Sequence, residues 1–189
     1  MDSETSLTGK LLIAMPGMQD PRFEQSVILI CEHSEKGAMG LVLNRPIGDI
    51  VFRDLLEQLG IESGPQSPDI PVRYGGPVEP GRGFVLHKAV NEALGEGSMR
   101  IGPDLAVTTT RELLEDIANG SHSEEAVLAL GYAGWSSGQL EGEIRANGWL
   151  TVDRENQIIF GTQDAGKWVA ALKLLGINPL LLSPSGGHA

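Results

Sequence analysis

The chain has 189 residues, of which 25 are acidic and 14 are basic, so its net charge is −11. This balance argues against a protein that coats nucleic acid or anionic lipid, because both surfaces require clustered lysine and arginine. The length is that of one domain able to bury a core without disulfides or metals, and a hydrophobic content of 41% excludes general disorder.

Hydrophobic periodicity and turn residues predict about eight strands in a single domain, residues 1–189. In chain order, strands are expected at residues 11–15, 27–33, 38–44, 70–74, 83–88, 106–110, 126–134, 149–152 and 157–160. Turn chemistry at residues 34–37 predicts a hairpin between the second and third strands. Residues 1–8 and 183–189 are expected to be loose tails.

Apolar residues at helical spacing predict about four helices. We expect the first to be capped by Asp49 and the second to begin with a capping box of Thr109 and Glu112. The third covers residues 137–146, and the fourth begins near Asp164. Because strands cluster early and helices are interspersed later, the order favours an α+β or mixed α/β fold over regular βαβ alternation.

The cysteine content and the N-terminus indicate the compartment. Cys31 is the only cysteine, which precludes an intrachain disulfide and fits a reducing environment. Residues 1–10 are polar and acidic and lack the apolar run of a signal peptide. The longest apolar runs have five residues, whereas a membrane-spanning helix needs about 20. We therefore expect a soluble, cytoplasmic protein that does not engage a membrane.

Six ordered phrases of the sequence are distinctive. They are Met15–Phe23, Gly40–Pro46, Tyr74–Val78, Gly83–His87, Gly131–Trp135 with Gly138–Glu141, and Trp149–Val152. Together they resemble the YqgE/AlgH family of bacterial proteins over nearly the whole chain. The resemblance implies an α+β fold in which a mixed, partly barrel-like sheet is flanked by helices. It implies no catalytic residues, because the family has no established enzymatic activity, although some members carry the label of transcriptional regulator. The sequence departs from the family pattern at Ser136-Ser137.

A polar, glycine-rich set of residues is the main candidate for ligand binding. Glycine permits close approach of the backbone, and arginine binds anions in a bidentate manner. Such a set would hold a small phosphorylated or carboxylate ligand; the alternative is a group of hairpin turns with solvated arginines. The candidate residues are Asn44, Arg45, Arg73, Gly75, Gly76, Arg82 and His87.

Residues 134–138 match the G-x-S-x-G motif between a predicted strand and a predicted helix, which is the context of a hydrolase nucleophile. Asp153 or Asp164, followed by His188, would supply the acid and the base. We favour another interpretation, in which Ser136 and the glutamine three residues later form a capping box.

Cys31 is a candidate for a redox role, which requires an exposed thiol of lowered pKa. Its neighbours Leu29 and Ile30 favour burial instead. Cys31 with His33 and His87 could also form a three-ligand metal site. The sequence contains no Cys-x-x-Cys, His-Glu-x-x-His, Walker or dinucleotide pattern, and we therefore expect no metal and no cofactor.

The three tryptophans, Trp135, Trp149 and Trp168, are most simply residues of the core. Glu141 and Glu143 lie early in a predicted helix, where they favour its dipole. We prefer that interpretation to a pair of catalytic carboxylates.

These observations favour a regulatory or small-anion-binding domain that acts through a small anionic ligand or a protein partner. One alternative is a transcriptional regulator that acts directly or indirectly on gene expression, and another is a hydrolase that uses Ser136. Direct nucleic-acid binding is not expected, because no predicted helix is rich in lysine or arginine.

Overall fold

The computed structural model describes residues 6–90, 93–122 and 125–181. Its strands are β1 (Lys10–Ala14), β2 (Val27–Ser34), β3 (Gly37–Val42), β4 (Val72–Tyr74), β5 (Val78–Lys88), β6 (Ser98–Ile101), β7 (Leu105–Thr108), β8 (Ala126–Ser136) and β9 (Trp149–Asp153). Its helices are α1 (Phe52–Gln58), α2 (Arg111–Ala118), α3 (Gln139–Arg145), α4 (Asp164–Leu174), a π-helical turn η1 (Gln157–Gly161) and a 3₁₀ turn η2 (Pro179–Leu181). No described helix is long and apolar enough to cross a bilayer.

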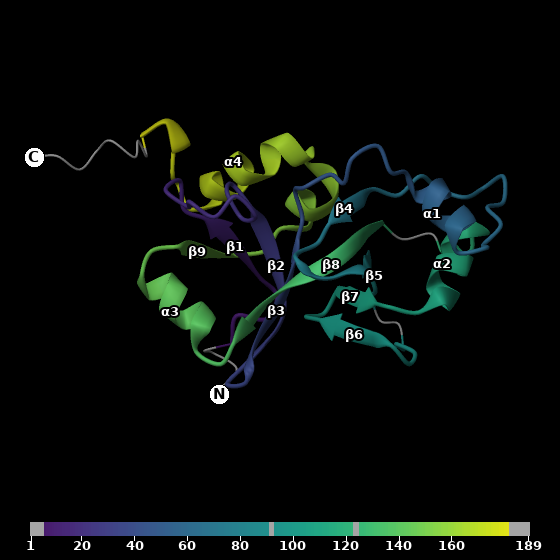
Figure 1. Cartoon of the computed structure of the whole chain (residues 1–189), viewed down its shortest axis with the longest axis horizontal. Helices are drawn as coiled ribbons and strands as arrows, with labels where there is room; N and C mark the ends of the chain where they lie inside the picture. Colours follow the sequence, from purple (N-terminus) through teal and green to yellow (C-terminus); the bar gives the residue numbers. More distant parts are fainter. Residues whose placement is uncertain (1–5, 91–92, 123–124, 182–189) are drawn as a thin grey trace, which may run out of the picture.

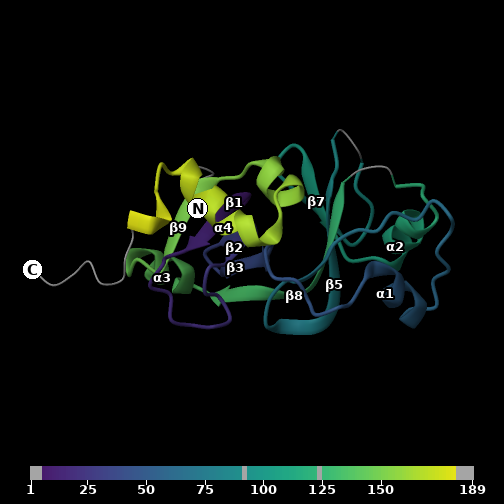
Figure 2. The same ribbon diagram turned by 90° about the horizontal axis from the view of Figure 1, so that it is seen from above.

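The described strands form one curled sheet in the order β6-β7-β5-β8-β3-β2-β1-β9, with antiparallel neighbours. β4 lies off this path and pairs with β8 in parallel. Helix α4 covers one face of the sheet, α1 and α2 lie together at one end, and α3 lies at the other end (Figure 1). Figure 2 shows the same separation from above, with α3 and α4 on one side and α1 and α2 on the other. The expected α+β fold with a partly barrel-like sheet is confirmed.

Most residues of β1 and β2 are buried on both faces of the sheet. In β1, Leu11 and Ile13 pack under α4, whereas Leu12 and Ala14 join the cluster beside α3. This explains why β1 and β2 read as continuous apolar runs instead of alternating patterns. A third apolar cluster lies under α1 and α2 and contains Phe52.

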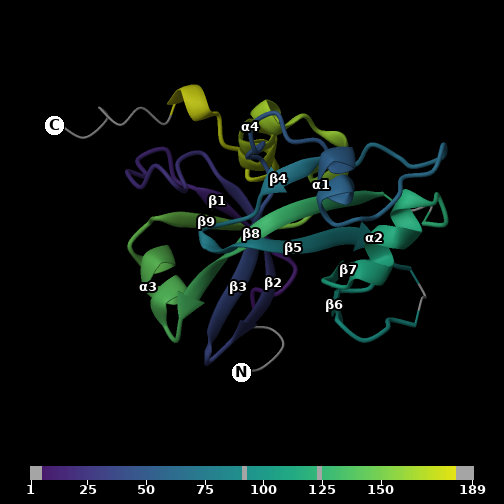
Figure 3. The ribbon, with the colours of Figure 1, turned by 45° about the vertical axis from the view of Figure 1, so that its right-hand side comes forward.

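Strand β8 joins the two halves of the molecule (Figure 3). Its first half pairs with β5 and β4, and its second half, residues 133–136, pairs with β3. The pairing of β8 with β5 is interrupted between Val78 and Gly83. The β8 edge that faces away from β3 is therefore uncovered beyond Tyr132.

Several local predictions were wrong. Residues 157–160 form η1 instead of a strand, because Ile158 and Ile159 are both buried and a short apolar run does not distinguish the two conformations. Strand β6 has no counterpart among the predicted strands, and its four residues pair only with β7.

The predicted helix caps also differ from the structure. The residues at the caps of α1 and α2 are Val51 and Thr110, and neither makes a side-chain cap bond. Thr109 instead donates its hydroxyl to the carbonyl of Gly97. The side chains of this turn are thus used for tertiary contacts.

Residues 6–8, expected to be part of a loose tail, are bonded to β2. The Leu7 amide donates to Nδ1 of His33 at 3.0 Å, and the His33 amide donates to the Thr8 hydroxyl. The other predicted tail, residues 183–189, lies outside the described residues.

The segment that contains Gly75 and Gly76 crosses the backbone of β8 at very close range. A Cβ atom on Gly76 would overlap the backbone of Tyr132, and one on Gly75 would overlap the carbonyl of Gly131. Gly131 has a φ of +76° and faces the carbonyl of Gly76 in turn. Only residues without side chains permit this crossing.

We predict that Gly76→Ala lowers the free energy of unfolding by about 3 kcal/mol or more, because backbone atoms on both sides prevent relaxation. Urea denaturation measures the loss. The control is Gly142→Ala within α3, where a Cβ meets open space and where alanine should stabilise by up to about 1 kcal/mol. Equal stability of the two variants would contradict the close crossing.

Candidate functional site

A groove of about 440 Å³ lies where α3, the end of β8, the start of β9 and the loop after β1 meet. We call it the tryptophan groove. It is lined by Met18, Asp20, Arg22, Phe23, Pro77, Val78, Gly134, Trp135, Gln139, Glu143, Ala146, Gly148 and Trp149. Its size is that of a small-molecule site, and its walls combine aromatic and aliphatic side chains with four polar or charged ones.

The carboxylate of Glu143 fixes the two tryptophan walls of the groove. Trp135 and Trp149 donate their indole N–H groups to the same oxygen, Oε2, at 2.8 and 2.9 Å. The other oxygen, Oε1, accepts a bond of 3.2 Å from the side-chain amide of Gln139. Two indoles on one acceptor leave little rotational freedom, so the walls are preorganised.

Aromatic contacts extend this arrangement. The ring of Trp149 meets Trp135 edge to face at 6.2 Å and Phe23 edge to face at 5.8 Å between ring centroids. At the rim, the Arg22 guanidinium lies over the Phe23 ring and bonds to the Asp20 carboxylate at 2.7 Å. That bond lowers the pKa of the Asp20 carboxyl below its usual value.

Two of the predicted ligand-binding residues hold the loop after β1, which forms one wall of the groove. The side chain of Asn44 accepts the amide N–H of Val27 at 3.0 Å and donates to the carbonyl of Gln25 at 2.8 Å. The guanidinium of Arg45 donates to the carbonyls of Pro21 and Glu24 at 2.9 and 2.8 Å. Both side chains therefore hold the backbone of this loop in place.

Two further predicted residues, Gly75 and Gly76, bring the next segment to the groove. Their crossing behind β8 delivers Pro77 and Val78 to the groove wall. The structure thus connects Asn44, Arg45, Gly75 and Gly76 to the groove, although none of the four lines it.

The remaining three predicted residues lie elsewhere and do not converge with these. Arg73 ion-pairs with Asp164 of α4 at 2.8 Å. His87 is buried in a separate hollow, with its Nε2 atom 2.9 Å from the Thr108 hydroxyl and its ring against His122. Arg82 lines a neighbouring hollow of about 570 Å³.

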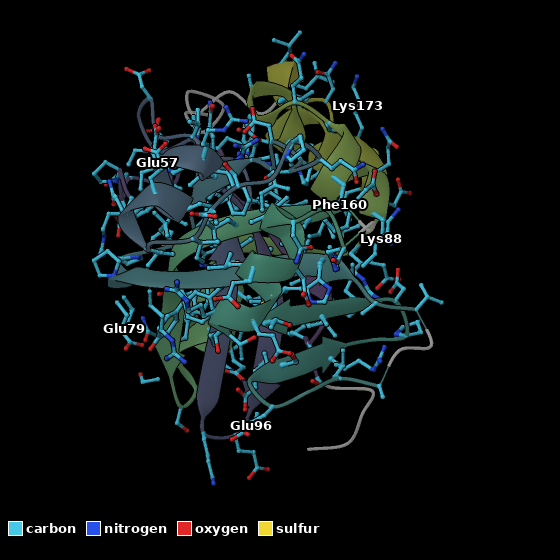
Figure 4. All side chains as sticks on the ribbon, turned by 90° about the vertical axis from the view of Figure 1, so that its right-hand side faces the viewer. Glu57, Glu79, Lys88, Glu96, Phe160 and Lys173 are labelled. Atoms are coloured by element: carbon cyan, nitrogen blue, oxygen red, sulfur yellow. The ribbon has the colours of Figure 1, made fainter. Side chains whose placement is uncertain are left out.

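Arg82 is tethered at the surface. It lies over the Phe84 ring and contacts the carboxylate of Glu79, which projects from the edge of the molecule (Figure 4). On the opposite edge of the same view, Lys88 lies near the Phe160 ring. The neighbouring hollow shares Val78, Gly134 and Trp135 with the tryptophan groove. The two cavities are therefore adjacent.

The G-x-S-x-G segment is not arranged as a nucleophile elbow with its partners. The Ser136 hydroxyl donates to the side-chain oxygen of Gln139 at 3.2 Å, and that oxygen also accepts the Ser136 amide at 3.0 Å. Asp153 pairs with Lys10, and Asp164 pairs with Arg73. His188 lies outside the described residues.

The predicted capping role of Ser136 is corrected, because the residue at the cap of α3 is Gly138, with a φ of +74°. The predicted pairing of the serine with the glutamine does occur. It holds Gln139 in place to bond Glu143.

Cys31 does not have the properties of a redox sensor. It is 1% exposed, and burial raises the pKa of its thiol to about 12. The expectation of burial from its apolar neighbours is met. Both ring nitrogens of His33 are engaged, by the Leu7 amide and by the Glu141 carboxylate. Within the described residues, no group of three histidine, cysteine or carboxylate side chains is placed to hold a metal.

Sequence reasoning missed the central role of Glu143 and of the two groove tryptophans. Trp135 and Trp149 are buried, as predicted for core residues, yet each directs its N–H to one carboxylate. The available signal was the resemblance itself. Four of its six phrases supply groove residues, at Met15–Phe23, Tyr74–Val78, Gly131–Trp135 with Gly138–Glu141, and Trp149–Val152.

We predict that the Cys31 thiol is inert toward a disulfide reagent in the native protein. The thiol is buried, and with a pKa of about 12 it forms almost no reactive thiolate at neutral pH. The reaction should become complete after addition of denaturant. Rapid labelling of the folded chain at neutral pH would contradict the buried placement.

The family of the chain follows from comparisons with known proteins. The family model described as AlgH-like matches residues 11–180. A UPF0301 protein of Paracoccus denitrificans is 68% identical, and the match covers both chains completely. A UPF0301 protein of Ruegeria pomeroyi is 56% identical over 97% of this chain and 99% of its own.

Solved structures agree with these matches. The solution structure of the AlgH protein from Pseudomonas aeruginosa has a TM-score of 0.80 and 41% identity, with 100% of this chain and 99% of that chain covered. A crystal structure of a Corynebacterium diphtheriae protein, with a TM-score of 0.71 and 21% identity over 92% of this chain and 89% of that chain, shares the fold. The chain belongs to the AlgH-like family.

Proposed function

We propose that this chain is a regulatory, ligand-binding domain of the cytoplasm and that the tryptophan groove is its binding site. The observation that carries the proposal is the network in which Glu143 fixes Trp135 and Trp149 around a cavity of about 440 Å³. Rigid aromatic walls reduce the entropy cost of binding, which is how a small site gains affinity. The single, buried thiol is compatible with a reducing compartment.

A binding role is better supported than a hydrolytic one. The Ser136 hydroxyl donates to Gln139, and the two acidic residues that the motif would use are paired with cations on other elements. A regulator that binds DNA by itself is poorly supported, because a net charge of −11 opposes contact with phosphates. An indirect role in gene expression, through a ligand or a protein partner, agrees with the proposal.

The test is a thermal-shift screen of metabolites on the full chain. A ligand at 100 times its dissociation constant should stabilise the fold by about 2.7 kcal/mol. Ala146→Phe should abolish that stabilisation, because Ala146 is an exposed residue of the groove lining and a bulky side chain there occupies the cavity without disturbing the core.

The matched control is Ala165→Phe, which makes the same substitution at an exposed residue of α4 outside the groove lining. It should bind as the unmodified chain does. If no compound stabilises the protein, or if stabilisation survives Ala146→Phe, the tryptophan groove is not the binding site.

A small-anion site is a second candidate, at Arg73 and Lys167. Both cations share one carboxylate, that of Asp164, at 2.8 and 3.2 Å. Lys167 is only 3% exposed, and its burial, together with nearby Arg73, lowers the pKa of its ammonium group. Among the residues that the structure describes, one positive charge of this half-buried cluster lacks a counter-charge, and a phosphate or carboxylate would supply it.

We predict that inorganic phosphate raises the unfolding temperature of the chain more than chloride does at equal ionic strength. Lys167→Gln should remove the difference, and Lys173→Gln, which changes an exposed lysine of the same helix, should keep it. Phosphate stabilises most proteins slightly because it is excluded from their surface. An equal effect of phosphate on the unmodified chain and on both variants would therefore count against the site.

A further inference from the structure

Among the described residues, the carboxylate of Glu143 has no cationic partner. Within residues 6–90, 93–122 and 125–181, its bonds come from two indole N–H groups and one amide, all of them neutral donors. An ionised carboxylate offers about four acceptor positions, and these bonds use three of them. The position that is left belongs to Oε1, the oxygen bonded only by Gln139.

The other charged groups of the groove do not neutralise Glu143. Arg22 is the cation of the groove, and it is committed to Asp20 by bonds to both carboxylate oxygens, between 2.7 and 3.2 Å. The groove lining therefore carries two negative charges and one positive charge. Half-buried carboxylates are normally paired with a cation, because removal of a charge from water is costly.

We propose that the tryptophan groove binds an organic cation, a guanidinium or primary ammonium group on an apolar stem. The cationic head bonds to Oε1 of Glu143, and the stem packs against the side chains of Phe23, Trp149 and Val78. The net charge of −11 attracts such a ligand at long range. This inference rests on the proposed function, since it names the chemistry of the ligand for the same groove.

The geometry favours a cation over the anion that the arginine content of the sequence suggested. Arg45, which lies closest in sequence to the loop of the groove among the predicted arginines, donates to two backbone carbonyls. The two indole N–H groups, which could have bound a ligand anion, are both occupied by Glu143. The groove thus already contains its own anion.

The experiment uses butylguanidinium and butylammonium as cations, butylurea as a neutral analogue of nearly the same shape, and pentanoate as an anion. Binding to the full chain is followed through the three indole N–H signals in a nitrogen–proton NMR spectrum, assigned by single Trp→Phe substitutions. We expect the signals of Trp135 and Trp149 to shift, and that of Trp168, which donates to the carbonyl of Ala14 in the core, to stay.

The cations should bind at least tenfold more tightly than butylurea, and pentanoate should not bind. Glu143→Gln should remove the preference for cations, whereas Glu57→Gln, an exposed residue of α1 at the other end of the molecule (Figures 1 and 4), should retain it. The comparison between butylguanidinium and butylurea is made on the unmodified chain, so it does not depend on the folding of a variant.

The outcomes separate the two proposals. If butylurea or pentanoate binds as tightly as the cations, the groove is a binding site but the inference of a cationic ligand is wrong. If no probe moves the signals of Trp135 and Trp149, the inference of a cationic ligand is overturned, and the groove as a binding site is decided by the thermal-shift screen. A capped arginine amide is compared with butylguanidinium to identify the source of the cation. Tighter binding of the arginine amide indicates recognition of an arginine side chain of a partner, and tighter binding of butylguanidinium indicates a free small molecule.

Discussion

The crossing of the chain at Gly75 and Gly76 over the backbone of β8 is the constraint on which the molecule depends. β8 belongs to both halves of the sheet, so its position relative to β3 and β5 fixes the whole curl. A side chain at either glycine would push the two segments apart. Because Pro77 and Val78 follow Gly76, the crossing also places one wall of the tryptophan groove. It leaves the β8 edge open at Gly134.

Polar residues around the tryptophan groove support its walls without lining it. Asn44 and Arg45 bond backbone groups of the loop that carries Phe23. Gln139, held by Ser136, supports Glu143, which in turn orients two indoles. Rigid supports of this kind keep binding groups in place. In the proposed site, the chemistry depends on one carboxylate that lacks a cationic partner among the described residues.

The fold was largely accessible from the sequence, and the site was not. Long apolar runs and turn residues predicted β1, the β2–β3 hairpin, β8 and α4 within a few residues, because burial on both faces leaves a strong local signal. The caps predicted at Asp49 and Thr109 were wrong, because the helices begin after Val51 and Thr110, and Thr109 bonds the carbonyl of Gly97 instead. Arginines that are scattered in the sequence could not be assigned partners, because carbonyl acceptors from distant loops are invisible in a linear pattern.

By itself, the sequence determined an acidic, single-thiol α+β chain, its principal strands and helices, and the six phrases that carry the family resemblance. Those properties depend on composition and on contacts between near neighbours. Only the tertiary structure decided that four of those phrases meet in one groove, that the candidate arginines are dispersed, and that two tryptophans share the oxygen of Glu143. The reason is physical: convergence of side chains depends on strand register and on the glycine crossing, which are set by packing between residues far apart in the chain.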